Sequence, residues 1–283
     1  MTNVMKTIRE FAIEAYRVST GPIRQQREAG MRREGKIPLS VLFYHRVADT
    51  IPNDWTMTTS QFREQLDWLG DNAKFSSLEE IQNRIQSGYN ESKCVHITFD
   101  DGYAENCDFA IPLLIERKIP CTYFVSLDFI LTGRAFPHDA AAGQPLTPNS
   151  IDQLRDMAAA GIEIGAHTRN HPDVGKITDP DTLRDEVITS TLELGELIGK
   201  PIRYFAFPFG LHENLNADAF DMLAESGIKG VCSAFGAYNF PSQDPFHFRR
   251  IHGDPEISRL KNWMTIDPRK LDLGRNLEVR RPT

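Results

Sequence analysis

The chemistry in this sequence begins with two adjacent carboxylates, Asp100 and Asp101, which follow the apolar run Cys94–Phe99 and precede Gly102. In a parallel α/β barrel, side chains at the carboxyl ends of the strands point into a cleft formed by the following loops, where catalytic residues lie. A single aspartate at such a place often caps the next helix instead. Two adjacent acids indicate a chemical role. For either aspartate alone, capping of the next helix is an alternative interpretation.

A second apolar run, Ile162–Ala166, ends in His167 and His171, which are four residues apart. Residues at this spacing share one face of a helical turn, and neutral imidazole nitrogens bind Zn²⁺ at about 2.0–2.1 Å. One carboxylate would complete a set of two histidines and one acid with open positions, which is typical of a catalytic metal. For the histidine pair alone, two surface residues beside the turn at Pro172 are the simpler interpretation. The preceding aspartates favour the metal site.

A third apolar run, Tyr204–Phe207, bends at Pro208 and Gly210. Glycine beside a strand often marks a place where the backbone can approach a ligand closely. Taken alone, this segment predicts a core strand followed by a turn. It indicates a functional role only together with the two polar segments that precede it in the chain.

The elements that must position these residues alternate along the chain. Apolar, β-rich runs predict strands at Leu39–Tyr44, Cys94–Phe99, Cys121–Val125, Ile162–Ala166, Tyr204–Phe207 and Ile228–Cys232. Apolar residues three or four apart predict helices at Gln61–Asn72, Leu78–Gln86, Ala104–Arg117, Ile151–Ala160, Thr182–Ile198 and Ala217–Ser226. The alternation is typical of a parallel α/β protein, and strands that are apolar throughout indicate burial on both faces. We therefore expect a closed or nearly closed barrel.

Residues 127–149 break this rhythm with glycines, prolines and small residues. Long irregular segments in compact domains are often functional. We expect this segment beside the active site.

Composition narrows the possible partners. The 283 residues carry 32 Lys and Arg against 39 Asp and Glu, a formal charge of −7, which argues against nucleic acid as a partner. No run of about 18 apolar residues predicts a transmembrane helix, and the charged N-terminus does not resemble a signal peptide, so we expect a cytoplasmic protein. Residues 4–17 have amphipathic helical spacing; we expect them to cover the protein's own core, with a membrane-surface position as the alternative. The cysteines, Cys94, Cys107, Cys121 and Cys232, are expected to be reduced.

Taken in order, the segments Thr98–Tyr103, His167–Pro172 and Phe205–Gly210 resemble the polysaccharide deacetylase family, carbohydrate esterase family four, also called the nodulation-type deacetylase homology domain. Upstream, Leu42–Val47 is similar to the opening strand of one bacterial branch. The resemblance implies an irregular (β/α)₇ barrel of parallel strands, a single domain over residues 38–255. Residues 1–37 would be an N-terminal helical extension and residues 256–283 a C-terminal tail.

The resemblance also implies a divalent metal, usually zinc, and removal of N-acetyl groups from an amino sugar or saccharide of the GlcNAc type. Asp100 would be the general base, while Asp101, His167 and His171 would hold the metal. Thr168 would support the metal ligands without binding the metal.

Further positions match the parts of the family's site that contact substrate. The backbone N–H of Tyr103 would help to hold the oxyanion, and Phe207, Pro208 and Phe209 would form one wall of the groove. The general acid would be a histidine in a late motif, for which His252 is the first candidate and His45 the second.

One departure from the family pattern concerns the arginine that many members place two residues before the third-motif proline, where it holds the base. This chain has Ala206 there. Arg249 or Arg250 is a candidate replacement, although an exposed arginine is the simpler interpretation.

Two alternative functions stay open. The first is the same metal hydrolase acting on another C–N bond, that of a formamide or a cyclic ureide. The second alternative is a catalytically silent carbohydrate-binding barrel, which the missing third-motif arginine at Ala206 favours, because a fold alone does not define a function.

Overall fold

The computed structural model describes residues 3–273, with side chains from residue 8 onward. The first two residues of the predicted extension and the last ten of the predicted tail lie outside the described residues. The main sheet is built of parallel strand pairs, in the order β10-β9-β8-β7-β6-β5-β1-β11. Its strands are β1 Leu39–Tyr44, β5 Cys94–Phe99, β6 Cys121–Val125, β7 Glu163–Ala166, β8 Tyr204–Ala206, β9 Gly230–Ser233, β10 His247–Arg249 and β11 Ile251–His252.

The sheet closes through its last stretch of chain. β10 pairs with β9, whereas β11 pairs with β1, and only Arg250 separates the two short strands. One segment therefore joins both edges of the sheet, which we call the seam. Counted as one interrupted strand, the seam completes a seven-membered wall with the six other strands, so the predicted irregular (β/α)₇ barrel is confirmed.

Asn239 stabilises the seam from outside the strands. Its side chain accepts a hydrogen bond from the Arg249 N–H and donates one to the Arg249 carbonyl, each at 2.8 Å. Its backbone pairs with Leu39 at the start of β1. Asn239 thereby satisfies backbone groups that the break between β10 and β11 would leave without partners.

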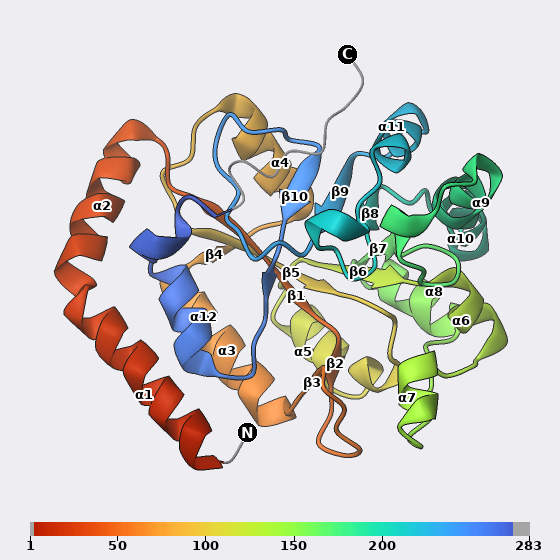
Figure 1. The fold of residues 1–283 in the computed structure, drawn as a ribbon, viewed down its shortest axis with the longest axis horizontal. Helices are drawn as coiled ribbons and strands as arrows, with labels where there is room; N and C mark the ends of the chain where they lie inside the picture. Colours follow the sequence, from red (N-terminus) through yellow and green to blue (C-terminus); the bar gives the residue numbers. More distant parts are fainter. Residues whose placement is uncertain (1–2, 274–283) are drawn as a thin grey trace.

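Helices surround this sheet (Figure 1). They are α1 Asn3–Ser19, α2 Gly21–Glu34, α3 Thr59–Asn72, α4 Leu78–Ser87, α5 Ala110–Glu116, α6 Leu127–Thr132, α7 Pro137–Ala141, α8 Ile151–Ala159, α9 Pro180–Arg184, α10 Ser190–Ile198, α11 Ala217–Glu225 and α12 Ile257–Met264. Short 3₁₀ turns cover Ala104–Cys107, Val174–Lys176, His212–Asn214 and Pro268–Lys270, and a π-helical turn covers Asp185–Thr189. Short strands β2 Arg46–Val47 and β3 Thr56–Met57 pair with each other, and β4 Lys74–Phe75 pairs with β5.

The six predicted strands are confirmed, with bounds that agree within two residues. Two predicted helices are divided. The one at Ala104–Arg117 is a 3₁₀ turn followed by α5, and the one at Thr182–Ile198 is interrupted by the π-helical turn. Neither β10 nor β11 was predicted, because strands of three and two residues carry no periodic signal.

The N-terminal helices lie along one side of the barrel, next to α12 (Figure 1). Tyr16 on α1 donates a hydrogen bond to Asp267 at 2.9 Å, and the buried Arg24 on α2 donates one to Asn262 at 2.7 Å. Part of the segment expected to be a tail therefore forms a packed helix. The outward face of α1 keeps Ile8 and Phe11 exposed, so this helix only partly covers the core.

All four cysteines are free thiols, as predicted. Among residues 3–273, no helix combines the length and the apolar character that crossing a membrane requires.

His96 in β5 is fully buried: its Nδ1 lies 2.8 Å from the Ser76 carbonyl and its Nε2 lies 2.9 Å from Thr122 Oγ1. Burial lowers the pKa of His96 to about 4. Because the unfolded chain binds a proton at this residue near pH 6.5 and the folded chain does not, stability is lost as pH falls from about 6.5 to about 4. We expect this residue to contribute about 3 kcal/mol of that loss.

Urea unfolding at pH 7, 6, 5 and 4 tests this expectation. His96→Gln should lose less free energy of unfolding between pH 7 and pH 4 than the wild type does. His212→Gln, which changes an exposed histidine, is the matched control and should follow the wild type. Parallel pH curves for His96→Gln and the wild type would contradict the assignment.

Candidate metal and catalytic site

A cavity of about 320 Å³ opens at the carboxyl ends of the barrel strands. It is lined by Phe43, His45, Trp55, Asp100, Asp101, His138, His167, His171, Phe207, Phe209, Leu211, Ala234 and Arg250. Six of them directly follow a strand, as expected for a site in a parallel barrel: His45, Asp100, His167, Phe207, Ala234 and Arg250. The cavity therefore collects most of the predicted site residues.

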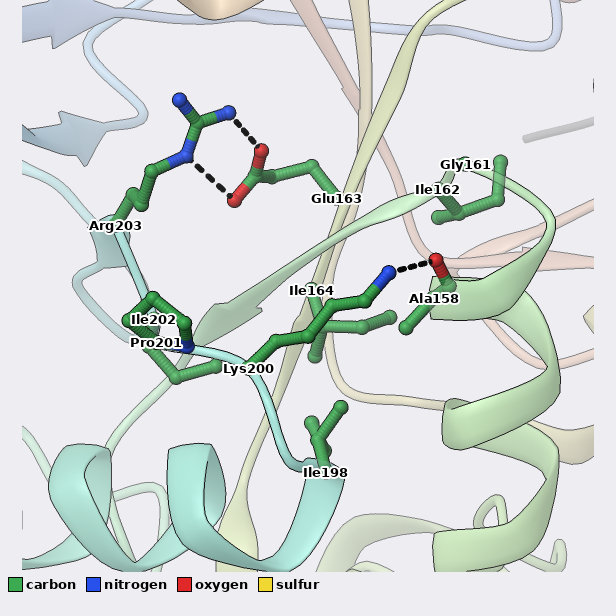
Figure 2. A pocket seen from close by; sticks show the side chains of 10 residues that line it. All are labelled: Ala158, Gly161, Ile162, Glu163, Ile164, Ile198, Lys200, Pro201, Ile202 and Arg203. Atoms are coloured by element: carbon green, nitrogen blue, oxygen red, sulfur yellow. Dashed lines mark hydrogen bonds and ion pairs between the residues drawn. The ribbon is translucent and has the colours of Figure 1, made fainter.

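A different cavity lies near the amino ends of β7 and β8, at the other end of the barrel (Figure 2). There Arg203 forms an ion pair with Glu163, and the Lys200 ammonium donates to the Ala158 carbonyl. These polar groups satisfy one another and leave no cluster of ligand atoms. This cavity is consistent with a structural role.

Asp100 is held by Arg250 through two hydrogen bonds. The guanidinium Nη1 donates to Oδ1 at 2.6 Å and Nη2 donates to Oδ2 at 2.8 Å. Arg250 also donates to the Ser233 carbonyl at 3.0 Å and to Thr98 Oγ1 at 3.2 Å. Asp100 is 3% exposed and Arg250 is 1% exposed, so both side chains are almost fully buried.

Burial alone would raise the pKa of Asp100, but the charge and hydrogen bonds of Arg250, together with interactions with His167 and His45, hold the pKa below its usual value. The carboxylate is therefore ionised at neutral pH. A buried, ionised carboxylate with a fixed orientation is suited to accept a proton.

The position of Arg250 shows which residue replaces the arginine that many family members have at the position of Ala206. An exposed arginine is the wrong interpretation for Arg250, which reaches Asp100 from the seam. Arg249 is also buried, and its guanidinium donates to Gln243 at 3.0 Å. Arg250, placed between β10 and β11, is thus the residue that holds the predicted base.

Asp101, His167 and His171 form a second cluster beside this pair. Each offers one ligand atom, and these atoms lie within 4.8 Å of one another. Nε2 of His167 is 3.6 Å from Asp101 Oδ1, and Nε2 of His171 is 3.3 Å from the same oxygen. The structure thus brings the three predicted metal ligands together.

The donor atoms are oriented for a ligand. Nδ1 of His167 lies 2.7 Å from the Ala206 carbonyl, which can only accept, so Nδ1 carries the hydrogen and Nε2 keeps a free lone pair. Asp101 Oδ1 is buried and has no hydrogen-bond partner among the described residues. An oxygen of this kind requires an explanation such as an ion. The arrangement fits a divalent metal with nitrogen and oxygen ligands.

Electrostatics agree with this arrangement. Burial lowers the pKa of His167 to about 4, so its imidazole is neutral, as metal binding requires. Burial would raise the pKa of Asp101, but the side-chain contact with His171 and the electrostatic interactions with His45, His171 and His167 hold the pKa well below its usual value.

The backbone at the site is strained. Asp101, Thr168, His171 and Phe209 all have positive φ angles, between 58° and 74°. Non-glycine residues rarely adopt this conformation, and such residues cluster at functional sites. The strain thus coincides with the residues predicted to do chemistry.

Tyr103 lies in a short pairing with the 147–149 segment. The Ala104 N–H donates to the Thr147 carbonyl and the Asn149 N–H donates to the Gly102 carbonyl, which leaves the Tyr103 N–H out of the pairing. The buried Tyr103 hydroxyl donates to Asp139 at 2.9 Å. Segment 127–149, predicted as a long irregular loop, contains the short helices α6 and α7. It supplies His138 to the cavity and therefore lies beside it, as predicted.

The predicted aromatic wall is divided between core and cavity. Phe207 is buried and stacks on Phe220, while it also lines the cavity. Phe209 is exposed and contacts the His171 ring edge-on, with ring centroids 5.2 Å apart. Pro208 between them is buried.

The two candidate acids lie at one corner of the site, with ring centroids 6.3 Å apart. His45 lines the cavity, and its buried Nδ1 has no hydrogen-bond partner in the described chain. His252 packs against Phe43 and Trp55 and is not among the cavity-lining residues. Burial lowers the pKa of both, to about 4 for His252. The geometry therefore places His45 ahead of His252.

Sequence patterns did not reveal Trp55, which stacks over His45 with ring centroids 4.7 Å apart. It lies in the connection between β2 and β3, which buried Arg46 holds by donating to the Ile51 carbonyl at 2.8 Å and to Thr56 Oγ1 at 2.9 Å. No periodic pattern marks a single tryptophan in a polar connection.

Comparisons with known proteins agree with the fold. A family model described as polysaccharide deacetylase matches residues 87–231, just over half of the chain. The chain belongs to the polysaccharide deacetylase family. YxkH of Bacillus subtilis (strain 168) is 26% identical over 237 residues, covering 81% of this chain and 76% of YxkH.

Two further relatives extend the comparison. The poly-beta-1,6-N-acetyl-D-glucosamine N-deacetylase of Staphylococcus aureus (strain MRSA252) is 25% identical over 207 residues, which is 70% of this chain and 68% of that protein. The solved structure of IcaB from Ammonifex degensii has a TM-score of 0.68 at 24% identity and covers 81% of this chain and 97% of IcaB. The structural likeness supports the same barrel fold.

The Asp100–Arg250 pair predicts a strong energetic coupling. Arg250→Met leaves a buried carboxylate without its partner, so the free energy of unfolding should fall by about 3–5 kcal/mol. Asp100→Asn together with Arg250→Met should cost less than the two single changes added together. Urea unfolding of all four proteins in the presence of a chelator measures the coupling.

Arg203→Met is the control, since it removes a partly exposed ion pair at the other end of the barrel. It should cost about 1 kcal/mol or less. Additive effects of the Asp100 and Arg250 changes would show that the pair is not coupled.

Proposed function

We propose that this protein is a metal-dependent N-deacetylase that removes acetyl groups from a saccharide of the GlcNAc type. The observation that carries the proposal is an ionised Asp100, fixed by Arg250, beside the cluster of Asp101, His167 and His171. The family and the N-deacetylase activity of the Staphylococcus aureus relative support the same reaction class.

Asp101, His167 and His171 would hold the metal, and their one oxygen and two nitrogen donors suit zinc. When bound, zinc would supply Lewis acidity and lower the pKa of a water molecule. The oxygen of Asp101 without a hydrogen-bond partner supports this assignment.

Asp100 would accept a proton from the attacking water, because Arg250 keeps it ionised and leaves its position fixed. Water oxygen would add to the acetyl carbonyl carbon, and the Tyr103 N–H would donate to the resulting oxyanion. Loss of one such donor typically costs about 3–4 kcal/mol of transition-state stabilisation. The C–N bond would then break to give acetate and a free amine.

The leaving nitrogen must receive a proton. We assign this step to His45 ahead of His252, because His45 lines the cavity and has a buried Nδ1 without a partner in the described chain. Lowered pKa values make both imidazoles neutral at pH 7, so the histidine must first gain the proton that the reaction releases. Arg250 would act on Asp100 and not on the substrate.

A substrate panel distinguishes the proposed function from the two alternative functions. A panel of acetylated amino sugars, a formamide and a cyclic ureide, assayed together with metal analysis of the purified protein, distinguishes deacetylation from cleavage of another C–N bond. A silent carbohydrate-binding barrel would bind saccharide and release no acetate. The cytoplasmic location and the absence of a nucleic-acid partner stay predictions.

Asp100→Asn and His171→Ala should separate the base from the metal site. Asp100→Asn should remain folded, retain zinc and lose nearly all acetate release, because the base need not bind the ion. His171→Ala should lose much of its bound zinc. Elemental analysis and an acetate assay on both proteins check this. Normal turnover in Asp100→Asn, or full zinc stoichiometry and affinity in His171→Ala, would refute the respective role.

The general acid is tested by comparing His45→Ala with His252→Ala. Loss of the acid should lower kcat by roughly 10²–10⁴-fold without loss of zinc. We expect the larger decrease in His45→Ala. The reverse order would assign the proton transfer to His252, and two active variants would assign it to another group or to water.

A further inference from the structure

The loop from His167 to His171, which carries both imidazoles, has no regular secondary structure. Thr168 and His171 have φ angles of 67° and 58°, which β-branched and aromatic residues rarely adopt. Thr168 Oγ1 accepts a hydrogen bond from the His171 N–H at 3.0 Å. This internal bond satisfies the His171 N–H, and neighbouring elements bind the other backbone groups of the loop.

The start of α6 satisfies the loop carbonyls. The bonds run from Ser126 Oγ to the His167 carbonyl at 2.7 Å, from the Leu127 N–H to the Thr168 carbonyl at 3.1 Å, and from the Asp128 N–H to the Arg169 carbonyl at 3.0 Å. The first amides of a helix have no partner within the helix and are free to donate in this way. One side of the loop is thus fixed by α6.

Glu186 satisfies the loop amides from the other side. Its Oε2 accepts hydrogen bonds from the N–H groups of Arg169 and Asn170, each at 2.9 Å. Its Oε1 accepts one from the Asn170 side chain at 3.0 Å. Glu186 is 7% exposed, so these bonds to a charged acceptor are shielded from water.

The π-helical turn Asp185–Thr189 carries this glutamate. A π-helical turn inserts a residue into an α-helix, changes the direction of the side chains around it, and frequently occurs at functional sites. The hydroxyls of Ser190 and Thr191 donate to the Glu186 and Val187 carbonyls, both at 2.6 Å, within this irregular segment. The local departure from α-helix is therefore supported by its own hydrogen bonds.

We propose that Glu186 is a positioning residue for the metal site, which holds the loop amides so that His167 and His171 converge on Asp101. This inference rests on the proposed function, because the metal ligands are those assigned there. Glu186 acts through backbone amides between the two histidines. Neighbouring Glu193 accepts a hydrogen bond from the Arg169 guanidinium at 2.9 Å and, within the described residues, none from a loop amide, so it offers a matched comparison.

Zinc affinity, measured by competition with a chromogenic chelator on the full chain, tests the proposal. Glu186→Ala should bind zinc about 10–100-fold more weakly, the usual effect of removing a group that orients metal ligands. Glu186→Gln keeps an oxygen acceptor and should bind zinc more tightly than Glu186→Ala does. Glu193→Gln, which neutralises a carboxylate in the same cluster, should retain wild-type affinity.

Circular dichroism and thermal unfolding in chelator establish that each variant is folded. If Glu186→Ala does not fold, Glu186→Asp takes its place. This variant keeps the charge but moves the carboxylate oxygens away from the amides, so it should bind zinc more weakly than Glu186→Gln does. Wild-type affinity in folded Glu186→Ala or Glu186→Asp overturns the proposal, as does equal weakening in Glu193→Gln. A wild type that binds no zinc and releases no acetate refutes the proposed function, and the inference with it.

Discussion

The buried ion pair between Asp100 and Arg250 links the closure of the barrel to its chemistry. Asp100 follows β5, whereas Arg250 interrupts the seam that joins β9 to β1. Two charges removed from water are stable only when their geometry is good and their remaining hydrogen-bonding groups are satisfied. The two Arg250–Asp100 bonds and the Ser233 carbonyl meet that condition. The orientation of the proposed base thus depends on how the last strand completes the wall.

Around this pair, the polar groups at the strand ends are satisfied by neighbouring elements with few exceptions. The Ala206 carbonyl orients His167, and Arg250 donates one hydrogen bond to each oxygen of Asp100. Asp101 Oδ1 and His45 Nδ1 are exceptions within the described chain. Both belong to cavity-lining residues. Because buried polar atoms normally have partners, these two atoms indicate where a metal and a substrate would supply the missing contacts.

The sequence predicted those parts of the molecule that have a local signal. Long apolar runs predicted the strands, and polar residues directly after them predicted the cluster of Asp101, His167 and His171. The family resemblance offered Arg249 or Arg250 as the partner of Asp100, but no local pattern could decide between them, because the pairing spans 150 positions and depends on two very short strands. Glu186 was not predicted at all, because an α-helical pattern does not show where a π-helical turn changes side-chain direction.

The relocation of the arginine shows why a missing motif residue is a poor argument for lost activity. In a closed barrel, the carboxyl ends of all strands face a common axis, so a guanidinium can reach Asp100 from more than one strand. Arg250 does so from the seam and packs over the rings of Phe43 and Phe124, 4.9 and 5.5 Å from their centroids. Ala206 has no side chain that could hold Asp100, and its backbone carbonyl accepts a hydrogen bond from His167 Nδ1. The alanine at position 206, which favoured a silent barrel, is therefore no evidence for one. The position of the guanidinium around the barrel axis matters more than its place in the sequence.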